Sequence, residues 1–251
     1  VEFLREKGLA TAQKKASRVA AEGLCKTLVA DDEKNAVVVE VNSETDFVAK
    51  NEKFQNYVAD VAAQAMNTTA ADIDAFLAEA WALDTTKTVK EALAAQIAVI
   101  GENMNIRRFA QMKEENGFVA SYIHAGGSIG VMVKFDTDVA DKEGFAEYGK
   151  DVAMQVAAAN PSYLTEAEVP AEVLEKEKEI LKVQAINEGK PEAIAEKMVQ
   201  GRIKKFYKEN CLIDQEFIKD GDQTIKSYTD AKAKELGGKI EIVSFVRFEK
   251  G

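Results

Sequence analysis

The side chains that could carry chemistry are few in this sequence. His124 is the chain's one histidine, so relays or metal sites built from several histidines are excluded. Cys25 and Cys211 are far apart and form no Cys-x-x-Cys pair, which argues against a zinc site and against a disulfide framework. Two such cysteines are typical of a reducing cytosol. One enzymatic hypothesis stays open, in which His124 acts with a nearby carboxylate on a small molecule.

A glycine-rich segment at residues 126–130 (GGSIG) has the composition of a phosphate-binding loop but not its pattern. It lacks the Gly-Lys-Ser/Thr ending and stands between two expected strands, so a hairpin turn explains it better. The nucleophile-elbow, zinc-protease and dinucleotide patterns do not occur in the sequence either. We therefore expect no catalytic residue, no metal site and no cofactor.

The most informative segment is residues 44–50 (ETDFVAK), which joins an expected strand to an expected helix. Two interpretations of it compete. In one, Thr45 or Asp46 caps the helix and Phe47 packs into the core. In the other, Phe47 is exposed, and an aromatic side chain kept in water would indicate a partner protein that covers it.

The charge balance limits the kinds of partner. The 251 residues carry a formal net charge of −10, whereas nucleic-acid binding needs an excess of Lys and Arg. We therefore expect no nucleic-acid partner. A basic patch at Lys14, Lys15 and Arg18 leaves a ribosome-associated protein as a weaker alternative. The longest apolar stretches, such as residues 92–100, are too short to span a bilayer, so no membrane partner is expected.

The first half of the chain is expected to combine helices with an antiparallel hairpin. The expected elements are, in order, the last turns of a helix at residues 1–7 stopped by Gly8, a short helix at 10–21, a hairpin of strands 24–29 and 37–41, a helix capped by Asn51, helices at 71–81 and 89–100, and a strand at 104–112.

The same order then begins again, which indicates an internal duplication. Strands are expected at 118–124 and 129–135, and the following helix (FAEYGKDVA, 145–153) matches the earlier one (FQNYVADVA, 54–62). The second copy is longer because residues 168–209 read as two helical runs around a Gly-Lys-Pro turn. Their narrow apolar seams favour a protruding antiparallel hairpin. The expected seams consist of Val169, Val173, Ile180 and Val183 facing Ile194, Met198, Val199, Ile203 and Phe206.

Four motifs in register resemble the elongation factor Ts family. They are TDFVAK at residues 45–50, IGENMNIRR at 100–108, YIHAGGSIG at 122–130, and KPEAIAEKMV at 190–199 followed by Gly201 and Arg202. The resemblance runs through almost the whole chain. It implies that the protein is a translation elongation factor, not an enzyme, that binds EF-Tu carrying GDP and promotes GDP release so that GTP can enter.

The resemblance also implies the fold. This is an α+β fold of two related subdomains with antiparallel sheets and packed helices, plus an inserted antiparallel coiled-coil hairpin. Residues 1–22 would be a remnant of an N-terminal helical domain with a linker helix. Residues 23–113 would form the N-terminal core subdomain, and 114–251 the C-terminal one with the insertion at about 168–209. This chain would then be part of a longer protein, in the bacterial cytoplasm or in an organelle.

The resemblance assigns partner-binding roles to a small set of residues. Thr45, Asp46, Phe47 and Val48 match the segment that dislocates magnesium from EF-Tu, with Phe47 as the wedge into the GTPase domain. The other contact positions are Ile100, Gly101, His124, Ile218 and Lys219. Relatives often carry two apolar residues at the last pair, so Lys219 departs from the pattern.

Overall fold

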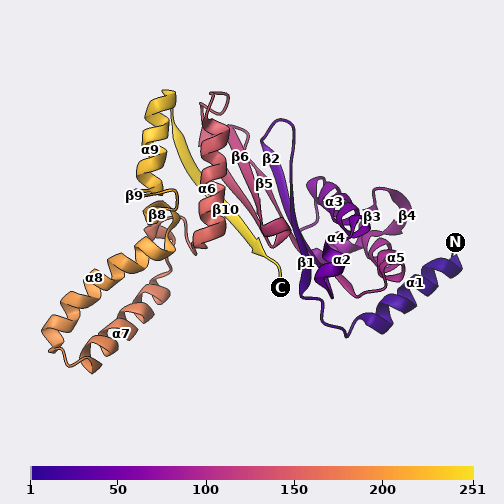
Figure 1. Ribbon diagram of the computed structural model, residues 1–251, viewed down its shortest axis with the longest axis horizontal. Helices are drawn as coiled ribbons and strands as arrows, with labels where there is room; N and C mark the ends of the chain where they lie inside the picture. Colours follow the sequence, from indigo (N-terminus) through magenta and orange to yellow (C-terminus); the bar gives the residue numbers. More distant parts are fainter. Residues whose placement is uncertain (1) are drawn as a thin grey trace.

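The computed structural model describes residues 2–251 and combines helices with antiparallel sheets (Figure 1). Two three-stranded sheets lie at the centre. Helix α6 (Phe145–Ala159) covers the outer face of one sheet, and α3 (Glu52–Met66) covers the outer face of the other. The expected α+β class is confirmed.

The first sheet has the order β1-β2-β5, from β1 (Glu22–Val29), β2 (Asn35–Ser43) and β5 (Met104–Lys113). The expected hairpin and closing strand are therefore confirmed. Strand β2 is buried along both faces. Val37, Val39 and Val41 pack toward α3, while Ala36 and Val38 point to the second sheet. A continuous run of valines suits a strand covered on both sides.

The second sheet repeats this arrangement with the order β10-β7-β6, from β6 (Gly117–His124), β7 (Ile129–Thr137) and β10 (Ile240–Glu249). A 3-10 turn at Ala125–Gly127 joins β6 to β7, so the glycine-rich segment is a hairpin connection as expected. Gly127 has φ 106°, and a Cβ atom there would lie 2.7 Å from Leu24 Cδ2. Glycine is favoured because residues with a side chain rarely adopt this positive φ, and the turn also packs on β1.

The inner faces of the two sheets share one apolar cluster, which joins the two halves of the chain. Its members come from both sheets and are Cys25, Ala36, Val38, Met112, Val119, Met132 and Phe248. Each outer face has a larger cluster with its own helices. The molecule therefore has three apolar layers of core.

The buried carboxylate of Glu40 forms hydrogen bonds that join the two sheets. Glu40 is fully buried, and its Oε2 accepts a hydrogen bond from Arg108 Nε at 2.6 Å. Its Oε1 accepts from Asn42 Nδ2 at 3.0 Å and from the backbone N–H of Gly251 at 3.2 Å. Arg108 in turn donates to the Glu249 carbonyl at the end of β10. These bonds connect β2 and β5 of the first sheet with the last strand of the second.

The N-terminal helix differs from the expectation. Helix α1 (Glu2–Lys15) runs through Gly8, and residues 16–21 are not helical, so the stop at Gly8 and the separate helix at 10–21 are both wrong. Gly8 is buried against α5 (Val89–Ile100), where a Cβ atom would lie 3.8 Å from the Ala94 carbonyl oxygen. Gly8 therefore lies within a continuous helix that packs on α5, and it does not end that helix. Val1, part of the expected helix remnant, lies outside the described residues.

The helix expected at residues 71–81 is also too long. Helix α4 (Ile73–Ala78) ends early and is followed by a small hairpin of β3 (Ala80–Trp81) and β4 (Asp84–Thr88). Trp81 is buried in that hairpin, with its ring centroid 6.1 Å from that of Tyr57. The helices α3 and α5 are confirmed, and the Asn51 side chain caps α3 by accepting from Lys53 N at 2.9 Å.

The small hairpin and its helix occur a second time. Strands β8 (Glu216–Phe217) and β9 (Asp220–Thr224) precede α9 (Ile225–Leu236). Thr88 and Thr224 each form a capping box at the start of their helix, and Gly101 and Gly237 each end it in the left-handed conformation. The two halves therefore repeat the same order of elements further than the sequence match indicated.

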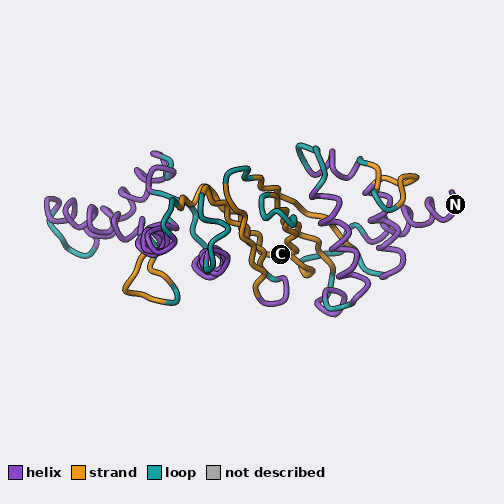
Figure 2. Tube along the Cα trace, turned by 90° about the horizontal axis from the view of Figure 1, so that it is seen from above, coloured by secondary structure: helices purple, strands orange, loops and turns teal. Residues whose placement is uncertain are grey.

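Between α6 and β8 the chain forms α7 (Ala171–Asn187) and α8 (Glu192–Asn210), with short 3-10 turns at Glu166–Glu168 and Leu212–Asp214 on either side. The two helices pack on each other and project away from the sheets (Figures 1 and 2). The expected seam is partly wrong, because Val173, Ile180, Val183 and Ile194 are exposed. The buried side chains of the pair are Ala185, Ala195, Val199 and Ile203.

Candidate interaction site

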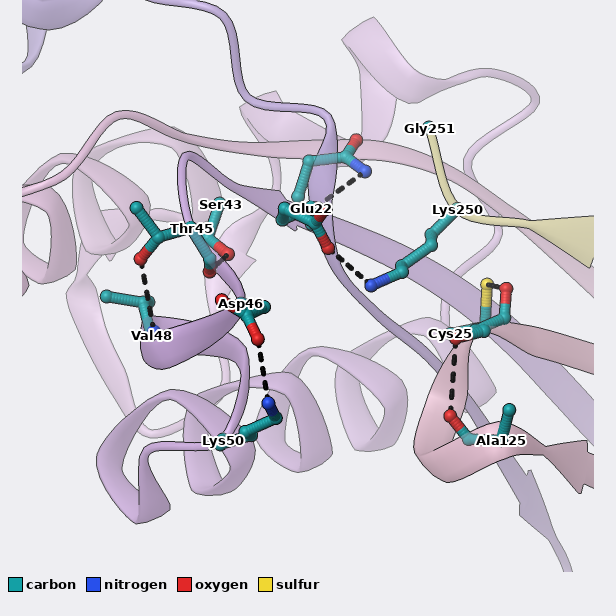
Figure 3. Close-up of polar contacts among 12 residues, drawn as sticks. Glu22, Cys25, Ser43, Thr45, Asp46, Val48, Lys50, Ala125, Lys250 and Gly251 are labelled. Atoms are coloured by element: carbon teal, nitrogen blue, oxygen red, sulfur yellow. Dashed lines mark hydrogen bonds and ion pairs between the residues drawn. The ribbon is translucent and has the colours of Figure 1, made fainter.

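The site predicted around residues 45–48 is built on a very short helix. Helix α2 (Asp46–Ala49) follows directly on β2, and Thr45 is its N-cap, as expected (Figure 3). The Thr45 hydroxyl oxygen accepts a hydrogen bond from Val48 N at 3.4 Å. A helix of four residues has too few internal hydrogen bonds to be stable by itself. Its position therefore depends on what anchors it.

The apolar side chains of α2 divide between the core and the solvent. Ala49 is buried, and Val48 packs at the edge of the first core cluster. Phe47 is 80% exposed. The interpretation in which Phe47 packs into the core is therefore wrong. Phe47 is thus the exposed aromatic side chain that the partner-binding interpretation requires.

Helix α2 is fixed on its other side by Glu102. The Glu102 Oε2 atom accepts from the backbone N–H groups of Glu44 and Thr45, both at 3.1 Å. Its Oε1 accepts from the Thr45 hydroxyl at 2.7 Å. Ile100 and Gly101 directly precede Glu102, so the structure brings these predicted contact positions to the Thr45 turn. The sequence reasoning missed Glu102, although it lies in the IGEN motif.

Glu44, in turn, forms a hydrogen bond with the segment that carries Glu102. Its Oε1 accepts from the backbone N–H of Asn103 at 2.6 Å and lies 3.6 Å from an Arg18 nitrogen. Lys15 donates to the Gly101 carbonyl at 2.7 Å. Two cations of the basic patch, Lys15 and Arg18, are therefore engaged with the body of the protein beside this site.

Asp46 and Lys50 form an exposed ion pair across α2, with 2.7 Å between Oδ2 and Nζ (Figure 3). The hydrogen bond from Lys50 holds the pKa of Asp46 below its usual value, and the same bond raises the pKa of Lys50. Glu22 and Lys250 form a second pair in the same view. The Glu22–Lys250 pair joins the start of β1 to the end of β10 beside the Asp46–Lys50 pair.

His124 ends β6 and is exposed. Its Nδ1 lies 3.1 Å from the Tyr122 hydroxyl, a phenol rather than a carboxylate. The turn that follows His124 contacts β1, as α2 does, so both predicted segments flank the first strand (Figure 3).

Ile218 and Lys219 lie far from α2, in the turn between β8 and β9 (Figure 1). Ile218 is 47% exposed, and its backbone N–H donates to Gln155 Oε1 at 2.9 Å. The Lys219 ammonium pairs with the buried carboxylate of Asp151, which also accepts from the Tyr228 hydroxyl at 2.8 Å. The lysine that departs from the family pattern is thus tied to the body, and Ile218 is the apolar side chain that the turn exposes.

No helix within residues 2–251 is long and apolar enough to cross a membrane. Among the same residues, no group of three or more His, Cys, Asp or Glu side chains is arranged to hold a metal ion.

The fold and the site together define an α+β protein that presents an exposed aromatic side chain, Phe47, on an anchored turn. The profile of the family described as Elongation factor TS matches residues 44–251. Elongation factor Ts of Clostridium tetani (strain Massachusetts / E88) is 54% identical over all of this chain and 82% of its own length. That of Clostridium perfringens (strain SM101 / Type A) is 55% identical over the same shares. The chain belongs to the elongation factor Ts family and is a translation elongation factor of protein biosynthesis.

Proposed function

We propose that this chain binds EF-Tu in its GDP-bound and nucleotide-free states and promotes the release of GDP, after which GTP binds. The observation that carries the proposal is the exposure of Phe47 on a turn anchored from both sides. Family membership supports the choice of partner.

In this proposal Phe47 inserts into the GTPase domain of EF-Tu while Thr45, Asp46 and Val48 disturb its magnesium site. Magnesium bridges phosphate oxygens and takes up much of their charge. Once it is displaced, the phosphates are no longer neutralised and GDP dissociates. The chain itself needs no cofactor and makes or breaks no bond, so it acts as an exchange factor and not as an enzyme.

The remaining contact positions extend this surface. Ile100, Gly101 and His124 lie on the segments that adjoin α2 and β1, and we assign them to the same contact. Ile218 at the far end of the molecule would form a second contact, with Lys219 holding its turn through Asp151. The helices α7 and α8 would pack as a coiled coil that reaches the partner. We place the protein in the bacterial cytoplasm, in line with its clostridial relatives.

Exchange by this route has a thermodynamic signature. Whatever factor the chain weakens GDP binding by, GDP must weaken binding of the chain by the same factor. The test is to mix the chain with EF-Tu loaded with a fluorescent GDP analogue and excess GTP. Faster loss of the label with increasing chain concentration supports the proposal, and a rate that does not depend on the chain would refute it.

The two other functional classes have less support. An enzyme that uses His124 would need a carboxylate to orient the imidazole, but Nδ1 faces the Tyr122 hydroxyl. A ribosome-associated protein held by the basic patch would need free cations, whereas two of its three cations, Lys15 and Arg18, are engaged with Gly101 and Glu44. We therefore assign no nucleic-acid partner, and we assign no membrane partner because the apolar stretches of the sequence are short. Salt-sensitive RNA binding by the chain would argue for the ribosomal alternative.

A further inference from the structure

Glu102, which follows the end of α5, forms several hydrogen bonds with the turn that carries Phe47. Its carboxylate accepts three hydrogen bonds, from two successive backbone N–H groups and from the Thr45 hydroxyl. A hydroxyl has one hydrogen to donate. By accepting it, Glu102 fixes the orientation of the hydroxyl, whose oxygen accepts the N–H of Val48 in the capping bond of α2.

The duplicated half of the chain shows what the fold needs at this place. Ser43 pairs with Met104 in the first sheet, and Thr137 pairs with Ile240 in the second. In the first half, Glu44 follows Ser43, and its carboxylate accepts a hydrogen bond from the backbone N–H of Asn103, just before β5, at 2.6 Å. In the second half, Asp138 follows Thr137, and its carboxylate accepts from the backbone N–H of Lys239, just before β10, at 2.7 Å. This bond is common to both halves, so we attribute it to the fold.

Glu102 has no such counterpart. The equivalent position is Gly238, where a Cβ atom would lie 2.3 Å from both Asp138 Oδ1 and Val139 Cγ1. The second half therefore closes its sheet with no side chain at that position. The carboxylate is present in the half that carries the exposed aromatic and is replaced by glycine in the other.

We infer that Glu102 is a positioning residue that holds the Thr45–Val48 turn so that Phe47 is presented to the partner in one orientation. The inference rests on the proposed exchange function. Phe47 is largely in water, so its direction is set by its backbone, which is fixed by Val48 and Ala49 on one side and by Glu102 on the other. Releasing one side makes the turn mobile, and the order must then be restored on binding, which weakens productive contact.

The test is a double-mutant cycle on the release of a fluorescent GDP analogue from EF-Tu at subsaturating chain concentration. Glu102→Ala should slow release about tenfold, which corresponds to ~1.4 kcal/mol. Glu102→Gln keeps a carbonyl oxygen for the two N–H groups and should stay within about twofold of wild type. In the Phe47→Ala background, Glu102→Ala should have less than about a twofold further effect, because both changes act through the same side chain.

Asp138→Ala is the matched control, since it removes the bond that both halves share. It should change the melting temperature and leave GDP release within about twofold of wild type. If Glu102→Ala does not unfold cooperatively, Glu102→Asp replaces it. The shorter side chain keeps the charge but cannot reach all three donors, and we expect at least about a threefold loss.

The outcomes separate this inference from the proposed function. A wild-type chain without effect on GDP release overturns both. A loss with Phe47→Ala, but none with Glu102→Ala or Glu102→Asp, overturns this inference alone. An undiminished tenfold effect of Glu102→Ala in the Phe47→Ala background also overturns it, because Glu102 would then act through the fold in general.

Discussion

At the scale of single residues, exposure separates function from packing. Phe47 and Phe54 lie on the consecutive helices α2 and α3, yet Phe47 is 80% exposed and Phe54 is fully buried. The first can be removed without leaving a cavity, and the second cannot. Substituting each residue therefore tests whether an effect on exchange comes from the contact or from the fold.

We expect Phe47→Ala to slow GDP release from EF-Tu at least about tenfold, since a desolvated aromatic at the centre of an interface contributes on the order of 2 to 4 kcal/mol. Its melting temperature should stay near that of wild type because no core contact is lost. Phe54→Ala serves as the control and should lose roughly 3 to 5 kcal/mol of stability. A large drop in the melting temperature of Phe47→Ala, with exchange intact, would show that the proposed role is wrong.

Asp46→Ala should have a smaller effect on exchange than Phe47→Ala. Asp46 is an exposed charge already paired with Lys50, and charges at the rim of an interface contribute mainly to association rate. The measurement is the salt dependence of the second-order rate constant for GDP release. An Asp46→Ala defect larger than that of Phe47→Ala would reverse the assigned order of the two roles.

Glu40 is expected to make stability depend on pH. Burial alone would raise its pKa, but hydrogen bonds from Asn42 and Arg108 and the nearby arginine charges lower it below the ordinary 4.5. A carboxylate with a lower pKa in the folded chain contributes stability above its unfolded pKa. That contribution is lost as the pH falls through the folded value.

Glu40→Gln should therefore lower the free energy of unfolding by about 1–3 kcal/mol at neutral pH. The difference from wild type should shrink as the pH falls below 4.5. Urea unfolding of both proteins across this range is the measurement, with exposed Glu216 changed to Gln as the control. An equal difference at neutral and acidic pH would contradict the lowered pKa.

At the scale of elements, the insertion between α6 and β8 is closed at its base by hydrogen bonds that involve only the last residue of its two helices, Asn210. The backbone N–H groups of Ser162 and Tyr163 donate to the Asn210 carbonyl, and Leu212 donates back to the Tyr163 carbonyl. These bonds lie outside most of α7 and α8. The body of the protein should therefore fold without the projecting part.

We expect replacement of residues 171–208 by a short Gly-Ser linker to keep a cooperative thermal transition and to weaken binding to EF-Tu. The bonds at the base and the helix α6 cluster remain in this variant. Calorimetry and a binding titration measure the two effects. Loss of cooperative unfolding would show that the hairpin is part of the core, and unchanged affinity would show that it does not reach the partner.

At the scale of the whole molecule, the two halves are joined by the cluster between the sheets and by Glu40. The two proposed core subdomains, residues 23–113 and 114–251, are thus related halves that share an inner apolar layer. Such a layer couples their unfolding, because neither sheet can lose its inner contacts alone.

We therefore expect one unfolding transition. Trp81 is the chain's only tryptophan and lies in the first half, so its fluorescence reports that half, while far-ultraviolet circular dichroism reports both. The two signals should change at the same denaturant concentration. Met132→Ala, in the shared layer, should cost about 2–5 kcal/mol and shift both together. Two separated transitions would show that the halves are independent domains.

The sequence determined those features that depend on neighbours along the chain. The Asn51 cap, the helix at 89–100, both hairpins and the repeated order follow from caps, turns and spacing over a few residues, and four motifs in register determined the family. These signals are local, since a helix cap or a strand alternation is set within three or four positions.

Only the tertiary structure decided which residues far apart in the chain contact each other. Gly8 carries the signal of a helix end, but α1 continues through it and packs on α5. Trp81 lies in a strand because Tyr57 and its neighbours bury it there. Glu102 reaches Thr45 only because β2 and β5 pair in one register, which places residues far apart in the chain side by side. Whether Phe47 is core or surface depends on such long-range contacts, which the short motif around it does not encode.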